Sequence, residues 1–302
     1  MNWFLIALAS PLLWSVCNHI DKILLDKYYR NVRAGSLMFM TSLMSLLMAT
    51  GIFLVKQSLV HIPLHSALLI LSAGVVYFLA LFPYLYALSR DEASRVIPLF
   101  QVQPFFSFLL GYIFLHEHLS PHQIVAGLII MGGSILISLD TDNGFRVKKT
   151  VLFLMMLSTG LFATEALLFK FVGLTVGFWS AALYQDIGCF IAGVALFASA
   201  PSFRNGFISV LRSSSAPVLV SSFLNESFNV IARMIFNYAT LLAPLALVTL
   251  VSGTQPLFVL VFGIILTIFW PKLSQESLLR HHLAQKVIAI LITFAGTYML
   301  LQ

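Results

Sequence analysis

The sequence is dominated by long apolar runs that are separated by short polar segments. Roughly 20 apolar residues cross a bilayer as a helix, so each run is long enough for one membrane span. The sequence therefore predicts an all-α membrane protein with ten transmembrane helices. These helices are expected near residues 3–26, 34–55, 65–88, 96–115, 122–139, 150–171, 176–199, 215–239, 245–269 and 284–301.

Composition agrees with a membrane location. Hydrophobic residues make up 60% of the chain and charged residues only 9%, whereas a soluble domain has about 25% charged residues. The net charge of +6 would suggest nucleic acid as a partner of a soluble protein, but here it indicates basic loops at one membrane face. We expect the lipid bilayer and a small-molecule substrate as partners, no nucleic acid, no cofactor, and a monomer or homodimer. Cys17 and Cys189 lie in apolar runs, so no disulfide is predicted.

The chain divides into two halves of five spans. The most polar connection runs from Asp140 to Lys149, and we expect one repeat over residues 1–140 and a second over residues 150–302. The halves align without a gap at an offset of 152 residues, and with a further insertion at 163 residues. These offsets pair Tyr86-Ala87 with Tyr238-Ala239, Gln103-Pro104 with Gln255-Pro256, Gly111 with Gly263, and Gly133 with Gly296.

An odd number of spans in each repeat reverses the second copy in the bilayer. The sequence thus predicts two inverted five-helix repeats. This is the plan of secondary transporters, whose substrate site lies near the midplane between the repeats. Such halves can rock to expose the site to each side in turn.

Several short motifs of the first half resemble the EamA domain of the drug/metabolite transporter superfamily. The second half repeats the pattern at Gln255-Pro256 and Ala295-Gly296, but Trp270-Pro271 and a longer loop replace the glutamate turn. The resemblance implies a ten-helix carrier with a central cavity, and many members export amino acids or other small metabolites. The motifs of the first half are Tyr84–Leu88 (YLYAL), Val96-Ile97-Pro98, Gln103-Pro104, Leu115-His116-Glu117 with Leu119-Ser120, and Gly127–Gly133 (GLIIMGG).

Positive charge gathers on alternate connections. The connections after the odd-numbered spans hold 14 Lys and Arg residues, whereas the others hold only Lys56 and Lys170. The positive-inside rule places both termini outside the cytoplasm, while the family resemblance implies cytoplasmic termini. We follow the charges, and we expect a multi-pass protein of the bacterial inner (plasma) membrane.

The eighth run carries a polar stripe. Asn225, Asn229, Arg233 and Asn237 are each four residues apart, so they share one face of a helix, with Glu226 on its edge. Arg233 is deep enough in the span to need a partner or a wet cavity. It either extends outward to the membrane surface or faces the cavity, held by Glu226 or Asn229, where it could bind a carboxylate or phosphate.

Other ionisable residues also fall at membrane depth. Asn18, Asp21 and Lys22 share a face of the first span, where they either mark its end or form a cavity cluster. Glu165 in the sixth span and Asp186 in the seventh are candidate inward carboxylates. Because burial disfavours a charged carboxylate, Glu165, Asp186 or Glu226 could exchange a proton during transport.

Two Gln-Pro pairs sit in the middle of symmetric spans. Proline removes a helix hydrogen bond and frees a carbonyl, so the pairs predict kinks, and Gln103 and Gln255 could bind a ligand. Tyr77 and Tyr84 either line the opposite wall or anchor the chain at the interface.

A histidine turn invites a metal interpretation that its spacing does not support. His116, Glu117, His118 and His122 match no recognised zinc motif, and we interpret them as a solvated turn, with no metal. The chain contains no phosphate-binding glycine loop and no hydrolase motif, so we do not expect an enzyme.

The candidate cavity residues mix two cations, Lys22 and Arg233, with four acids. This mixture predicts a secondary active transporter, with export expected, of a small polar zwitterion such as an amino acid, working by alternating access, with proton coupling as a hypothesis. A phosphorylated metabolite or a lipid head group stays open as substrate. The alternatives of another class are an intramembrane enzyme that uses the buried acids and histidines, and a channel or scaffold subunit.

Overall fold

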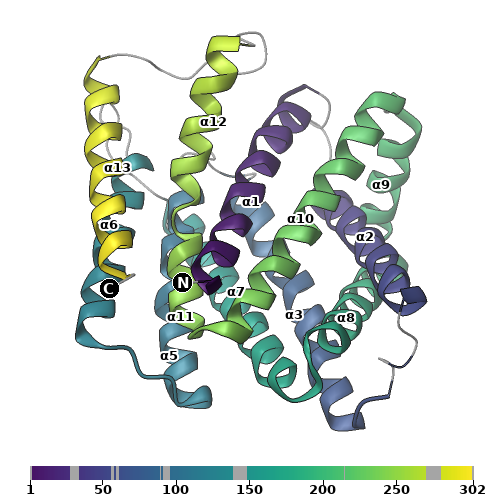
Figure 1. Cartoon of the computed structure of the whole chain (residues 1–302). Helices are drawn as coiled ribbons and strands as arrows, with labels where there is room; N and C mark the ends of the chain where they lie inside the picture. Colours follow the sequence, from purple (N-terminus) through teal and green to yellow (C-terminus); the bar gives the residue numbers. More distant parts are fainter. Residues whose placement is uncertain are drawn as a thin grey trace.

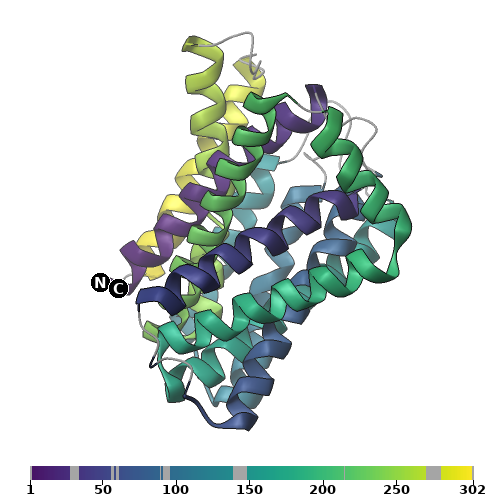
Figure 2. The ribbon, with the colours of Figure 1, turned by 90° about the vertical axis from the view of Figure 1, so that its right-hand side faces the viewer.

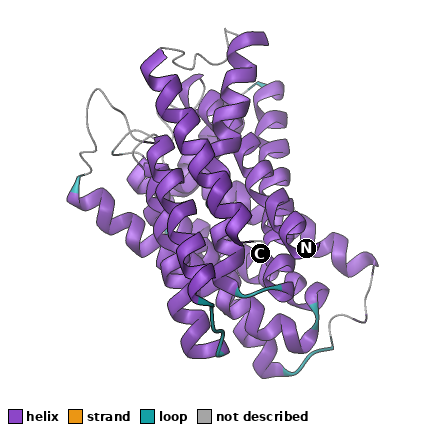
Figure 3. Ribbon diagram, turned by 60° about the vertical axis from the view of Figure 1, so that its left-hand side comes forward, coloured by secondary structure: helices purple, strands orange, loops and turns teal. Residues whose placement is uncertain are grey.

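The computed structural model describes residues 2–27, 34–55, 58, 61–88, 90, 96–138, 148–213, 215–269 and 280–300. All regular structure in these residues is helical (Figures 1 and 3). The elements are α1 (Asn2–Lys27), α2 (Ala34–Val55), α3 (Leu64–Leu88), η2 (Ile97–Val102), α5 (Gln103–Leu115), α6 (Pro121–Ser138), α7 (Lys149–Val176), α8 (Phe178–Ser199), α9 (Pro201–Ser213), α10 (Ala216–Leu242), α11 (Leu245–Ser252), α12 (Gln255–Phe269) and α13 (Arg280–Leu300).

Length and hydropathy support a membrane protein. Within the described residues, six segments are long and apolar enough to cross a bilayer: parts or all of α1, α2, α3, α7 and α8, and the α11–α12 stretch Leu245–Phe269. Three shorter apolar helices add Leu99–Leu115, Pro121–Leu136 and Val287–Leu300. The predicted all-helical membrane fold is confirmed at this level, while the ten-span arrangement in two repeats stays a prediction.

Two long apolar stretches are broken just before a proline. The 3-10 helix η2 ends at Val102 and α5 begins at Gln103, while α11 ends at Ser252 and α12 begins at Gln255. Proline fits the first turn of a helix because its missing N–H has no partner there. The Gln-Pro pairs therefore begin new helices. The two helix interruptions lie beside each other inside the bundle, where Gln101 bonds Gly253.

The turn before α6 is built by its sequence. Ser120 and Gln123 exchange hydrogen bonds, from Ser120 N to Gln123 Oε1 at 2.9 Å and from Gln123 N to Ser120 Oγ at 3.2 Å. This is a capping box with Pro121 in the first turn. His116 ends α5 in a left-handed conformation, with φ of 53°, so the chain reverses sharply between α5 and α6.

Glycines allow two pairs of helices to pack closely. A Cβ on Gly74 of α3 would lie 2.0 Å from the Gln185 carbonyl oxygen of α8, and one on Gly188 would lie 2.1 Å from the Leu71 carbonyl oxygen. Similar contacts join α6 to α13, where a Cβ on Gly133 would lie 2.9 Å from the Thr293 nitrogen. These helices lie backbone against backbone.

Helix α9 is an element that the sequence did not predict. Its residues are too polar for a span, but Phe207 and Val210 on one face are buried. The Phe207 ring packs edge-on against Phe39 of α2, with centroids 4.7 Å apart, and near Phe197 of α8. Helix α9 therefore closes one corner of the bundle beside α2 and α8 (Figures 1 and 2).

The largest apolar cluster lies toward the chain termini. Phe4 and Leu300 belong to it, together with Leu167, Phe236 and Leu245, so helices of both halves meet there. Beyond this cluster, the Lys170 Nζ of α7 lies 2.5 Å from the Glu117 Oε1 in the turn before α6. The bundle is thus closed at this end by apolar packing and by one ion pair.

Candidate functional site

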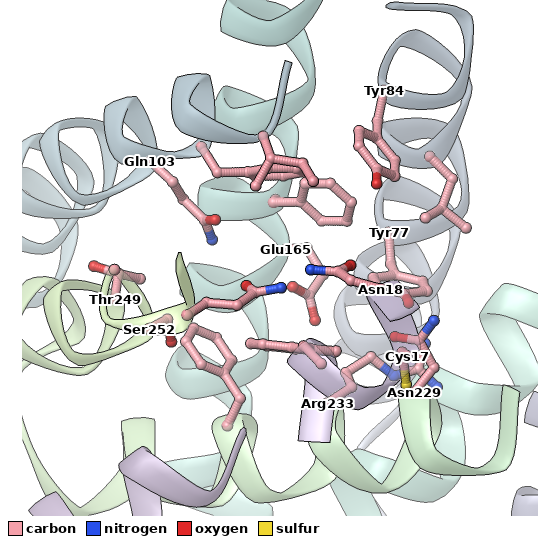
Figure 4. Close-up of a pocket in the computed structure, with 18 of the residues that line it drawn as sticks. Cys17, Asn18, Tyr77, Tyr84, Gln103, Glu165, Asn229, Arg233, Thr249 and Ser252 are labelled. Atoms are coloured by element: carbon pink, nitrogen blue, oxygen red, sulfur yellow. The ribbon is translucent and has the colours of Figure 1, made fainter. Parts of the chain in front are cut away.

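A central cavity of about 180 Å³ lies between the two halves of the chain. Gln103, Thr249 and Ser252 lie on one side of it and Tyr77 and Tyr84 on the other (Figure 4). Its lining comes from eight α-helices, η2 and Gly253: Trp14, Cys17, Asn18, Asp21, Thr41, Tyr77, Leu81, Tyr84, Ile97, Phe100, Gln101, Gln103, Phe162, Glu165, Asn229, Arg233, Phe236, Thr249, Ser252, Gly253, Gln255 and Pro256.

Arg233 lies at the edge of this cavity, with only 3% of its surface exposed. Its guanidinium forms an ion pair with Asp186 of α8 and donates to Ser45 Oγ of α2 at 3.2 Å. The guanidinium carbon also lies 4.3 Å from the centre of the Tyr77 ring, a cation–π contact. Its Nη1 is buried without a hydrogen-bond partner, so the two N–H groups of this nitrogen are unpaired.

Glu165 is held by a chain of amides. Asn237 Nδ2 donates to Gln185 Oε1 at 2.8 Å, and the Gln185 amide donates to Glu165. The three residues come from α10, α8 and α7, and each is almost fully buried. The network holds the Glu165 carboxyl group in place at the cavity, because the Gln185 amide donates to Glu165 Oε1.

A second acidic site lies on α1. Asn225 Nδ2 donates to Asp21 Oδ1 at 2.6 Å, and the Cys17 thiol lies 3.5 Å from the Asn225 carbonyl oxygen. Glu226 is the residue after Asn225 on α10. The Glu226 Oε2 is buried without a hydrogen-bond partner.

The two helix breaks meet at the cavity wall. Gln101 Nε2 donates to the Gly253 carbonyl oxygen at 3.1 Å, and Ser134 Oγ donates to the same oxygen at 2.5 Å. A side chain on Gly253 would be crowded, because a Cβ would lie 2.9 Å from the Leu250 carbonyl oxygen and 2.7 Å from Gln101 Oε1. The carbonyl freed by one break is therefore satisfied from the other half.

Most of the residues predicted from the sequence gather at this cavity. Four do not line it: Asn225 bonds Asp21, Asp186 pairs with Arg233, Asn237 bonds the Gln185 that holds Glu165, and Glu226 follows Asn225 on α10. The side chain of Lys22 lies outside the described residues. The predicted residues that line the cavity are Asn18, Asp21, Tyr77, Tyr84, Gln103, Glu165, Asn229, Arg233 and Gln255.

Two sequence interpretations are corrected. The partner of Arg233 is Asp186 on another helix, rather than Glu226 or Asn229 on its own helix. Lys170, which we counted in a connecting loop, lies inside α7 with 6% exposure, because α7 continues to Val176.

The histidine turn is only partly the solvated segment that we expected. His116, His118 and His122 are exposed, but Glu117 pairs with Lys170 and accepts a hydrogen bond from Leu245 N at 2.7 Å. In the described part of the chain, no group of three or more His, Cys, Asp and Glu residues is placed to hold a metal ion.

The aromatic wall was missed by the sequence analysis. Phe100 packs against Tyr84 and Phe162, with ring centroids 5.1 and 6.1 Å apart. Phe162 continues to Tyr77 at 5.7 Å. A phenylalanine in an apolar helix gives no signal that separates a cavity wall from a lipid-facing surface, so only the tyrosines were identified.

Comparisons with known proteins agree with this architecture. The model of the EamA-like transporter family matches residues 1–139, which confirms the resemblance seen in the motifs. A solved protein crystal structure superposes with a TM-score of 0.72 at 12% identity, over 99% of this chain and 96% of the other. At that identity the likeness concerns the fold alone. No curated protein matches the sequence significantly.

Proposed function

Because residues 1–139 match the EamA-like transporter family and the helices are apolar enough to span a bilayer, we propose that this integral, multi-pass membrane protein is a secondary carrier. It moves a small polar metabolite by alternating access. The observation that carries the proposal is the central cavity, which is lined from both halves and holds the buried Arg233 and Glu165.

The proposed carrier consists of two inverted five-helix repeats with ten spans. Helix pairing supports this arrangement, because α1 packs on α10 as α7 packs on α3, and α6 packs on α13. The glycine contacts are also reciprocal. A Cβ on Gly133 would meet Thr293, and one on Gly296 would meet Ile130, which are equivalent pairs at the offset of 163 residues.

Alternating access is supported by the asymmetry of the cavity. Asp21 and Tyr84 lie near the ends of α1 and α3 that lead to the Lys/Arg-rich connections. Toward the termini, the apolar cluster around Leu167 and Phe236 fills the bundle. The described conformation therefore fits one half of a transport cycle, with the termini side closed.

Transport by purified protein in liposomes tests the function. We expect saturable uptake of at least one member of a panel of small polar metabolites, driven by its own gradient or by a pH gradient. Glu165→Gln removes the proposed proton-exchanging group, and we expect transport by this variant to be indifferent to the pH gradient. Flux that rises linearly with concentration for every compound would contradict a carrier.

Substituting Asn229 tests whether the cavity binds the substrate, without disturbing an ion pair. It lines the cavity, so Asn229→Ala removes a polar contact without leaving a charge unpaired. A lost neutral hydrogen bond costs about 1 kcal/mol, so we expect KM for the transported substrate to rise about fivefold. The matched control is Asn205→Ala on the exposed surface of α9, which should leave KM unchanged.

A further inference from the structure

Acidic groups outnumber basic ones around the cavity. Among the described residues that line it, Asp21 and Glu165 carry carboxyl groups and Arg233 is the one cation. The charge of Arg233 is already compensated, because the guanidinium pairs with Asp186 and lies over the Tyr77 ring. Within the described part of the chain, no ion pair compensates the other two lining carboxyl groups, those of Asp21 and Glu165.

One unpaired acceptor lies among the lining residues. Of the buried side-chain atoms without a hydrogen-bond partner, Gln101 Oε1, Asn18 Nδ2 and Arg233 Nη1 belong to residues that line the cavity, and Gln101 Oε1 is the acceptor. Buried acceptors are normally satisfied by a donor, which can belong to a ligand. Gln101 lines the cavity, so a small rotation of its amide would present this acceptor to a substrate N–H group.

Aromatic rings beside the acids could also bind a cation. Tyr84, Phe100, Phe162 and Tyr77 form a continuous series of ring contacts along one side of the cavity. The faces of such rings attract cations and pack against apolar groups. Tyr84 and Asp21 both line this cavity. The aromatic series therefore begins in the same cavity as a carboxyl group that has no ion-pair partner among the described residues.

We propose that the substrate of this cavity is an aromatic amine in its cationic form. Its ammonium group pairs with Asp21 and its ring packs along Tyr84, Phe100 and Phe162. The inference rests on the proposed carrier function and narrows it, because a zwitterion would bring a carboxylate next to an excess of acids. The unpaired guanidinium nitrogen, Arg233 Nη1, donates to a neutral acceptor on the substrate.

A charge series on one aromatic skeleton tests the inference. Tyramine, tyrosine and 3-(4-hydroxyphenyl)propionate share a phenol ring and differ in charge, as cation, zwitterion and anion. Binding to the purified full chain in nanodiscs is measured by calorimetry, with empty nanodiscs subtracted to remove partition into lipid. We expect tyramine to bind at least tenfold more tightly than either of the others. Equal or tighter binding of tyrosine or the propionate, or no binding of tyramine, overturns the inference.

Variants of Asp21 separate the acid from general damage to the fold. Asp21→Asn keeps an oxygen that accepts the Asn225 hydrogen bond but removes the charge, and we expect tyramine affinity to fall at least tenfold. Asp21→Glu keeps the charge and should restore most of the affinity. If Asp21→Asn binds tyramine as the native chain does while the melting temperature is unchanged, Asp21 is not the ammonium site and the inference fails.

Failure of this inference is distinguishable from failure of the carrier proposal. Transport of tyrosine without binding of tyramine overturns the amine inference and leaves the carrier intact. Binding of tyramine that depends on Asp21, without flux of any compound in liposomes, supports the amine site and contradicts the carrier.

Discussion

At the scale of single residues, the buried ion pair between Arg233 and Asp186 makes the protein sensitive to substitution of either residue. Both side chains are at most 3% exposed, so loss of one partner leaves the charge of the other largely buried. Removing one partner of a buried ion pair costs about 3–5 kcal/mol, because the other charge stays buried and uncompensated. We expect Arg233→Ala to lower the melting temperature of the purified protein strongly. Arg212→Ala, at an exposed arginine of α9, should leave it unchanged.

A double variant separates the lost charge from the lost volume. Arg233→Met combined with Asp186→Leu removes both charges and keeps apolar bulk, which is often neutral for a buried pair. The double variant should therefore melt higher than Arg233→Ala alone. If it melts lower, the cost arises from packing rather than from an unpaired Asp186.

Polar residues within apolar helices can be identified from the sequence, whereas their partners on other helices cannot. Arg233 and the asparagines beside it could be identified because a polar residue in an apolar helix requires a wet or paired environment. Asp186 was identified for the same reason, but nothing in the sequence places it against α10 rather than against another helix. The contact of Lys170 with Glu117 was missed because each residue lies at a predicted span end, where exposure is the ordinary expectation.

At the scale of helices, apolar runs predict the elements closely. The predicted span 34–55 coincides with α2, and the predicted span 245–269 coincides with α11 and α12 together. Helix α9 was missed because only continuous apolar runs were sought, and its apolar residues are spaced around a largely polar segment. The breaks at Gln103 and Gln255 were predicted as kinks, because proline in a helix interior removes a hydrogen bond.

Close helix packing gives a prediction with an internal control. In Gly74→Ala, the new Cβ would lie 2.0 Å from the Gln185 carbonyl oxygen and 2.6 Å from the Cys189 nitrogen. Both are backbone atoms, so α3 and α8 must move apart. Overpacking costs about 1–3 kcal/mol, and we expect a lower melting temperature. Because Gln185 also holds Glu165, transport should fall as well.

The matched change is Gly132→Ala on α6. The new Cβ would have no atom of a neighbouring element within 4 Å, and the residue is exposed. Alanine is favoured over glycine in a helix by about 1 kcal/mol, so this variant should be as stable as the native chain or more stable. A similar loss of stability in both variants would show that the α3–α8 contact is not what Gly74 is needed for.

At the scale of the whole molecule, one ion pair joins the two halves at the closed end. Glu117 lies in the first half, and it bonds Lys170 of α7 and the Leu245 nitrogen that begins α11. Lys170 Nζ also donates to the Ala243 carbonyl oxygen at 2.6 Å. The turn between α5 and α6 is thereby tied to α7 and to the connection between α10 and α11, and opening this end requires these bonds to break.

Glu117→Gln should therefore favour opening toward the termini side. A hydrogen bond to a charged group contributes about 1.5–3 kcal/mol, and each 1.4 kcal/mol changes an equilibrium about tenfold.

Cys17 lines the cavity, and in a Cys189→Ser background it is the only thiol, since the chain has two cysteines. We expect a membrane-impermeant thiol reagent, added on the termini side of oriented vesicles, to label Cys17 about tenfold faster in Glu117→Gln. His118→Ala, in the same exposed turn, should leave the rate unchanged, and an unchanged rate in Glu117→Gln would mean that the apolar cluster alone keeps this end closed.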